Sequence, residues 1–141
     1  MTIEQLGMIP GLTPPVGKDA SHANRGRWLE DLCDWTHAIY RRDGLARIDR
    51  NYPESKRLKS DGFARITGTA LCDYSGLLAG GRAVAFDAKE CRTASIPLDR
   101  VKPHQLDHLT DVWRLGGVAF VLVAFRRRGD DRVYAIPAET W

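Results

Sequence analysis

The apolar run GGVAFVLVAF at 116–125 constrains the fold of this chain more than any other segment. It is too short to cross a bilayer, so it predicts a β-strand whose two faces are both covered. A strand of this kind requires a sheet with further layers packed on each side. Arg126, Arg127 and Arg128 follow it directly, and we expect them to cover the end of the strand in solvent.

Apolar periodicity predicts a helix, several strands, a second helix and two more strands, in that order. The first helix should run from about Asn24 to Tyr40, and the second, about a dozen residues long, should end at Gly116 with Leu106, Leu109 and Trp113 on one side. We expect strands at 44–53, at two or three places within 63–90 around a turn at 78–82, at 118–125 and at 132–137. This order predicts an α/β or α+β domain with a mixed sheet and flanking helices. Its length of 141 residues suits one domain, with 23–141 as the folded part and 1–22, rich in Pro and Gly, as a flexible arm.

The segment AVAFDAKECR at 83–92 looks like a strand, yet it carries two charges. Residues two apart on a strand point to one face, so Asp87 and Lys89 share a face with Ala83 and Ala85. Val84 and Phe86 lie on the other face and can anchor the strand in the core. Because small residues precede the charged pair, we expect the charged face to open to solvent, to a partner charge or to an ion.

Asp73, in LCDYSG, precedes this pair on what should be the neighbouring strand. If the two strands pair, Asp73 and Asp87 converge, and a divalent cation would relieve their repulsion. Magnesium is commonly held by one or two carboxylates and water, so Asp73 and Asp87 are candidate metal ligands. Lys89 could stabilise charge on a phosphate under attack or orient the attacking water. The alternative interpretation is an exposed ion pair at a strand edge.

The net charge of +3 is unevenly distributed, because basic residues concentrate between Arg25 and Arg65. Such a cluster suits a polyanion such as DNA, although an ordinary solvated surface fits it equally well. The candidate DNA-binding residues are Arg25, Arg27, Lys56, Arg57, Lys59 and Arg65. The three cysteines, odd in number and without a CxxC pair, favour reduced thiols and a cytoplasmic location. We read neither a secretory signal nor a membrane segment, and therefore expect no membrane partner.

Seven segments in order resemble the RecU-type Holliday junction resolvases, within the wider PD-(D/E)XK nuclease fold. They are NRGRWLEDLC, YRRDGLARIDRNYP, CDYSG, FDAKE, IPLDRVKPHQLDHL, GGVAFVLVAF and YAIP, and they extend over most of 24–137. Two positions depart from the family pattern: Leu71 stands where a threonine is frequent, and Asp87 stands where glutamate is usual.

The resemblance implies a restriction-endonuclease-like α/β fold and a homodimeric, Mg²⁺-dependent endonuclease, in which Mn²⁺ can substitute, acting on branched four-way DNA. It implies metal ligation by Asp73, Asp87 and Gln105, directly or through water, with Lys89 as the transition-state cation. Glu30 would be a helix-borne carboxylate near the metal, although it is equally well a solvent-facing helix residue. The segment 54–66 would form a short basic stalk that enters the junction. A flap or restriction-like nuclease and a non-catalytic junction-binding protein remain alternatives, and the identity of any recombinase partner stays open.

Overall fold

The structure, a computed structural model, describes residues 27–53, 55–57, 64–66, 68–127 and 130–141. The predicted N-terminal arm at 1–22 and the predicted helix start at Asn24 lie outside the described residues. For 55–57 and 64–66 the description covers the backbone alone.

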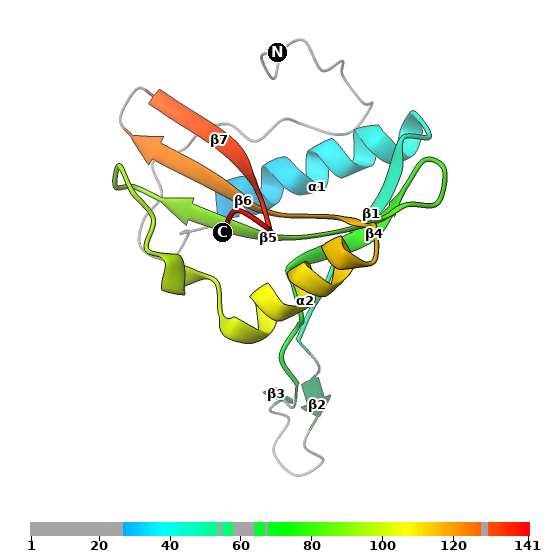
Figure 1. Cartoon of the computed structure of the whole chain (residues 1–141), viewed down its shortest axis with the longest axis horizontal. Coiled ribbons are helices and arrows are strands. Elements are labelled where there is room, and N and C mark those ends of the chain that lie inside the picture. Colours follow the sequence, from blue (N-terminus) through cyan, green and yellow to red (C-terminus); the bar gives the residue numbers. More distant parts are fainter. Residues whose placement is uncertain (1–26, 54, 58–63, 67, 128–129) are drawn as a thin grey trace.

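A five-stranded mixed sheet in the order β1-β4-β5-β6-β7 forms the centre of the molecule (Figure 1). Its strands are β1 (Ala46–Arg50), β4 (Tyr74–Leu78), β5 (Ala83–Cys91), β6 (Val118–Arg127) and β7 (Asp130–Pro137). β5 and β6 run parallel, whereas the other neighbouring pairs are antiparallel. The parallel pair is connected through helix α2 (Pro103–Arg114), as a crossover between parallel strands requires. The mixed α/β architecture predicted from the sequence is therefore confirmed.

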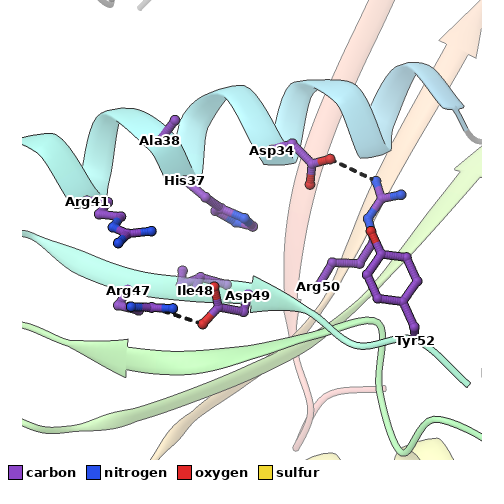
Figure 2. Close-up of a pocket in the computed structure, with 9 residues that line it drawn as sticks. All are labelled: Asp34, His37, Ala38, Arg41, Arg47, Ile48, Asp49, Arg50 and Tyr52. Atoms are coloured by element: carbon purple, nitrogen blue, oxygen red, sulfur yellow. Dashed lines mark hydrogen bonds and ion pairs between the residues drawn. The ribbon is translucent and has the colours of Figure 1, made fainter. Parts of the chain in front are cut away.

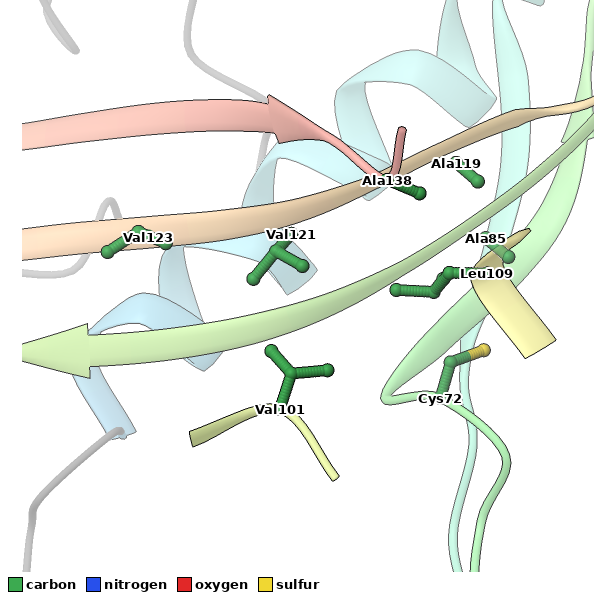
Figure 3. Packing of buried hydrophobic residues seen from close by; sticks show 8 residues of the cluster. All are labelled: Cys72, Ala85, Val101, Leu109, Ala119, Val121, Val123 and Ala138. Atoms are coloured by element: carbon green, nitrogen blue, oxygen red, sulfur yellow. The ribbon is translucent and has the colours of Figure 1, made fainter. Parts of the chain in front are cut away.

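The two faces of the sheet are covered by different helices. On one face, Val121 and Val123 of β6 pack with Leu109 of α2 in a buried cluster (Figure 3). On the other face, Phe120 and Ala124 belong to a cluster built around α1 (Arg27–Arg42), whose buried residues are Leu29, Cys33, Trp35 and Ile39. β6 thus lies between two layers, as its uninterrupted apolar sequence predicts.

Two expectations about large side chains are wrong. Trp113 remains 41% exposed, because the preceding residue, Val112, packs against the α2 cluster in its place. Arg126 does not point into solvent: β6 continues past it, and its guanidinium lies 4.4 Å from the Trp28 ring and 3.4 Å from Asp131. The sequence predicted that one strand ends at 125 and the next begins at 132, but the β6–β7 ladder extends to the pair Arg127 and Asp130.

A second, two-stranded sheet stands apart from the main one. It consists of β2 (Ser55–Arg57) and β3 (Ala64–Ile66), which pair antiparallel in the connection between β1 and β4. Figure 1 shows this ribbon projecting away from the sheet below α2. Its position agrees with the stalk-like insertion expected at 54–66. In the described part of the chain, helices are all too short or too polar to cross a membrane.

Candidate active site

Asp87 lies in the middle of the sheet and is 0% exposed. β5 presents Val84 and Phe86 to the α1 side and Ala85, with Asp87, to the opposite side. We expected the small residues on that face to leave it open. Instead Ala85 is buried in the cluster that contains Leu109, and the Asp87 carboxylate is surrounded by polar partners.

Asp73 and Asp87 converge, as the sequence predicted. Asp73 occupies the bend just before β4, and its backbone N–H donates to Asp87 Oδ1 at 3.0 Å. In return, the backbone N–H of Ala88 donates to Asp73 Oδ2 at 2.9 Å. Each carboxylate is thereby held by the backbone of the other's segment, which fixes the two side chains relative to one another.

Lys89 provides the cation between them. Its Nζ donates to Asp87 Oδ2 at 2.6 Å and lies 3.6 Å from Asp73 Oδ2. The Lys89 side chain is 15% exposed, whereas that of Asp73 is 39% exposed, so the group opens to solvent on the Asp73 side. Burial raises the pKa of Asp87, an effect that the hydrogen bond from Lys89 opposes and the charge of Asp73 reinforces. The pair of carboxylates therefore favours a positive charge at this point.

Gln105 reaches the site, but as a hydrogen-bond donor. Its Nε2 donates to Asp87 Oδ1 at 3.0 Å, while its Oε1 accepts from the backbone N–H of Lys102 at 3.0 Å in the capping box of α2. The oxygen that would bind a metal is used to cap the helix. Metal ligation by Gln105, directly or through water, stays a prediction, and direct ligation would require this oxygen to leave the cap.

Glu30 is not brought to the two aspartates. Its Oε2 pairs with Arg50 Nη1 at 3.2 Å, and Arg50 also donates to the Tyr74 hydroxyl at 3.0 Å. The side chain of Glu30 is 48% exposed on α1, the helix on the other side of the sheet from Asp87. The solvent-facing interpretation of Glu30 agrees with this position.

The predicted DNA-binding residues are only partly described. Arg27 is exposed at the first described turn of α1. Arg25 and Lys59 lie outside the described residues, and the backbone alone places Lys56, Arg57 and Arg65 on the β2–β3 ribbon, with Lys56 opposite Arg65. Their contact with DNA stays a prediction.

The cavity between α1 and β1 is not part of this site. It measures about 420 Å³, and Figure 2 shows side chains of both elements around it. Its charges largely neutralise one another, since Arg47 pairs with Asp49 at 3.1 Å and Arg50 with Asp34 at 3.2 Å. None of Asp73, Asp87 and Lys89 lines it. A second cavity of about 470 Å³, beside α2 and β4, is lined by Asn51 and Cys72 and so reaches the segment next to Asp73.

The donor set suits a hard divalent cation. Two carboxylates meet at one partly exposed point, and Mg²⁺ is usually bound by one or two carboxylates with water completing its shell. Over the part of the chain that is described, three His, Cys, Asp or Glu residues never gather as a metal-binding group. A metal at Asp73 and Asp87 would thus have two carboxylate ligands from the described residues, without Glu30.

Sequence reasoning did not single out Asn51, whose side chain donates to the carbonyl of Cys72 at 3.1 Å beside the site. The only local signal was a polar residue at the end of the predicted 44–53 strand, which is too common to indicate a role.

Comparison with known proteins decides the family. The family model described as "RecU: Recombination protein U" matches residues 24–141. The chain belongs to the RecU family. The resemblance inferred from the seven segments is confirmed.

Relatives of this RecU-family chain include proteins named "Holliday junction resolvase RecU" from three organisms. The protein of Streptococcus pneumoniae strain CGSP14 is 31% identical over 137 residues, which cover 89% of this chain and 67% of the relative. Those of Bacillus pumilus strain SAFR-032 and Staphylococcus epidermidis strain RP62A are 29% and 27% identical, with 91% and 87% of this chain and 65% and 62% of the relatives covered. The chain thus spans about two thirds of the length of these relatives. A solved structure titled "Crystal structure of SSO0001" aligns with a TM-score of 0.33 at 14% identity, covering 77% of this chain and 52% of that one.

Proposed function

We propose that this RecU-family chain is a Mg²⁺-dependent, structure-specific endonuclease that resolves four-way DNA junctions by paired phosphodiester hydrolysis. Membership of a family whose members are named Holliday junction resolvases supports the substrate class. The observation that carries the chemistry is the convergence of Asp73, Asp87 and Lys89 on one partly exposed point. Carboxylates that can hold a metal ion and a lysine that can stabilise negative charge are groups suited to hydrolysis of a phosphodiester.

Each residue has a distinct proposed role. Asp73 and Asp87 hold the metal, and Asp87 is the rigid member because Asp73 N–H and Gln105 both donate to its Oδ1. When bound, a divalent ion supplies an activated water and neutralises developing negative charge. Lys89 stabilises the charge on the phosphate under attack, and binds Asp87 when no phosphate is present. Mg²⁺, with Mn²⁺ as a substitute, is the proposed cofactor because the donors are hard carboxylate oxygens.

The shape of the substrate supports a homodimer. A four-way junction must be cut at two symmetric positions, and a two-fold dimer supplies two sites related by the same symmetry. We propose that the β2–β3 ribbon enters the junction and that exposed Arg27 contacts the phosphate backbone.

The three buried cysteines form no disulfide, which is compatible with a reducing cytoplasm.

A cleavage assay on a labelled four-way junction, beside linear duplex and flap DNA, tests the proposal. With Mg²⁺ the junction should be cut in preference to the other substrates, and a chelator should abolish cutting. The variants Asp73→Ala and Asp87→Ala should bind the junction and fail to cut it. Intact cutting by either variant would overturn the site. Equal cutting of flap or linear DNA would favour another nuclease of this fold, and binding without cutting by the wild type would favour a junction-binding protein.

The role of the ribbon has a separate test. Charge reversal at Lys56, Arg57 and Lys59 together should lower the preference for branched over linear DNA, because each residue can neutralise a backbone phosphate. Gel-shift competition between the two DNA forms measures this preference. An unchanged preference would remove the stalk from the proposal.

A further inference from the structure

We infer that Asn51 is a positioning residue of the cutting site, which holds Asp73 where its carboxylate can meet the metal ion. The inference rests on the proposed function in one respect, namely that Asp73 is a metal ligand. It assigns a role to a side chain that touches neither of the reacting carboxylates and that acts through the backbone of residues 72–73.

Asp73 needs such support because the regular sheet ends before it. The β1–β4 ladder finishes at the pair Arg50 and Tyr74, and the β4–β5 ladder finishes at Tyr74 and Phe86. Beyond these pairs Asp73 lies in a bend, and its hydrogen bonds toward β5 run through side chains rather than a backbone ladder. The position of such a segment therefore depends on its contacts with the strand on its other side, β1.

Asn51 holds it from the β1 side with both its backbone and its side chain. Its backbone N–H donates to the carbonyl of Asp73 at 2.8 Å, one residue beyond the regular ladder. Its Nδ2 donates to the carbonyl of Cys72 at 3.1 Å and lies 3.4 Å from the Cys72 sulfur. Its Oδ1 accepts from the Ser75 hydroxyl at 3.0 Å. Among the described residues, the side-chain hydrogen bonds of this half-buried amide are made with residues 72 and 75, on either side of Asp73.

The geometry requires an amide at this position. The donor faces a carbonyl oxygen and the acceptor faces a hydroxyl, so a carboxylate here would retain the Ser75 bond but oppose the Cys72 carbonyl. An alanine would lose both bonds and leave the Cys72 carbonyl without this donor. Asn51 begins the leg of chain that runs from β1 to β2, while 68–73 belong to the leg that returns from β3 to β4 (Figure 1). The amide therefore joins the two legs at the base of the ribbon, beside Asp73.

The substitution Asn51→Asp separates positioning from simple electrostatics. An added negative charge near two carboxylates should tighten the binding of a cation if charge alone matters. If Asn51 acts by placing Asp73, the same variant should bind the cation more weakly, because the bond to Cys72 becomes a repulsion. Loss of a group that orients a metal ligand typically costs about 10- to 100-fold in affinity.

The experiment measures Mn²⁺ binding by the intact chain without DNA, by electron paramagnetic resonance of the free ion, alongside junction cutting. Asn51→Asp and Asn51→Ala should weaken Mn²⁺ binding about 10-fold or more and raise the Mn²⁺ concentration needed for half-maximal cutting. Ser75→Ala, which removes only the donor to Oδ1, should weaken binding roughly 2- to 10-fold, and it carries the test if Asn51→Ala does not fold. Asp49→Asn, an exposed change on the same strand, is the matched control and should leave Mn²⁺ affinity unchanged.

Mn²⁺ binding by Asn51→Asp that equals or exceeds wild-type binding would overturn the inference, as would an equal loss in Asp49→Asn. These outcomes are distinct from failure of the proposed function. If the wild type binds Mn²⁺ and cuts junctions while the Asn51 variants match it, the positioning role alone is wrong. If the wild type binds no Mn²⁺, the metal site and the positioning role are both overturned.

Discussion

Replacing Lys89 with methionine should strongly destabilise the fold, and the loss of unfolding free energy can be worked out from the geometry around Lys89. Lys89 Nζ lies 2.6 Å from Asp87 Oδ2, and the Asp87 side chain is fully buried. At that separation and an effective dielectric of about 20, the attraction between the two charges is about 6 kcal/mol. Methionine relieves the desolvation of the ammonium but leaves a buried carboxylate without its cation, so the net loss should be about 3 kcal/mol. Since domains are stable by about 5–15 kcal/mol, this is a large share of the total.

The loss should grow with pH. Burial raises the pKa of Asp87 and the Lys89 hydrogen bond opposes that rise, so the variant should have a still higher Asp87 pKa. Where Asp87 is protonated in both proteins, Lys89 keeps only its longer ion pair with the partly exposed Asp73, so its removal costs less. As pH rises through the folded pKa of Asp87, the variant must ionise a buried and unpaired carboxylate, and it loses stability.

Urea unfolding in the presence of a chelator, at about pH 5 and about pH 8, measures both effects. The chelator prevents a divalent ion from replacing the missing lysine. Adding Asp87→Asn to Lys89→Met should restore much of the stability at the higher pH, since the carboxylate charge is gone while Oδ1 still accepts its two hydrogen bonds. The reasoning is refuted if Lys89→Met is as stable as the wild type at pH 8, or if its loss is the same at both values.

Two further predictions concern the α1 side of the sheet and the β1–β4 ladder. Burial lowers the pKa of His37 to about 4; the charge of Asp49 raises this pKa and that of Arg50 lowers it, both less strongly. The stability that neutral His37 contributes should therefore be fully present above about pH 6.5 and be lost as pH drops toward 4. The full pKa shift corresponds to about 3 kcal/mol, and solvent screening of this partly exposed ring reduces it to about 1–2 kcal/mol. In unfolding titrations between about pH 7 and pH 4, His37→Gln should therefore lose about 1–2 kcal/mol less stability than the wild type. An equal loss of stability in both proteins would contradict the prediction. Gly76→Ala places a Cβ against the backbone carbonyl of Arg47 in the β1–β4 ladder, so it should lower stability by about 3 kcal/mol or more; an unchanged melting temperature by circular dichroism would show that the strands can move apart freely.

The sequence predicted the layers of sheet and helices well, because each layer follows from the spacing of apolar residues within one segment. The unbroken apolar run at 118–125 required cover on both faces, and β6 has it. Alternation along 44–53 predicted a strand, and β1 indeed alternates, with Ala46 and Ile48 more buried than Arg47 and Asp49. The prediction failed where a neighbouring strand decided the outcome: Arg126 lies beyond the predicted strand end at 125, yet its pairing with β7 brings it beside Asp131 and Trp28.

The candidate site shows the same division. Alternation on one strand placed Asp87 and Lys89 on one face, and the antiparallel hairpin between β4 and β5 brought Asp73 to them. Of the environments expected for the charged face, the structure supplies a partner charge, Lys89, at Asp87 and solvent on the Asp73 side. The room expected above Ala85 is filled, because α2 and the 71–73 bend, which are distant in sequence, cover it. Gln105 could have offered its oxygen or its nitrogen, and capping of α2 uses the oxygen.

The amino-acid sequence by itself determined which segments form strands and helices and which charged side chains share a strand face. These features follow from periods of two and 3.6 residues along a single segment. Only the assembled fold decided the partners of polar atoms: Glu30 with Arg50, Gln105 with Asp87, and Asn51 with Cys72 and Ser75. The physical reason is that a polar atom removed from water must pair with whatever group lies within about 3 Å, and that neighbour comes from another part of the chain.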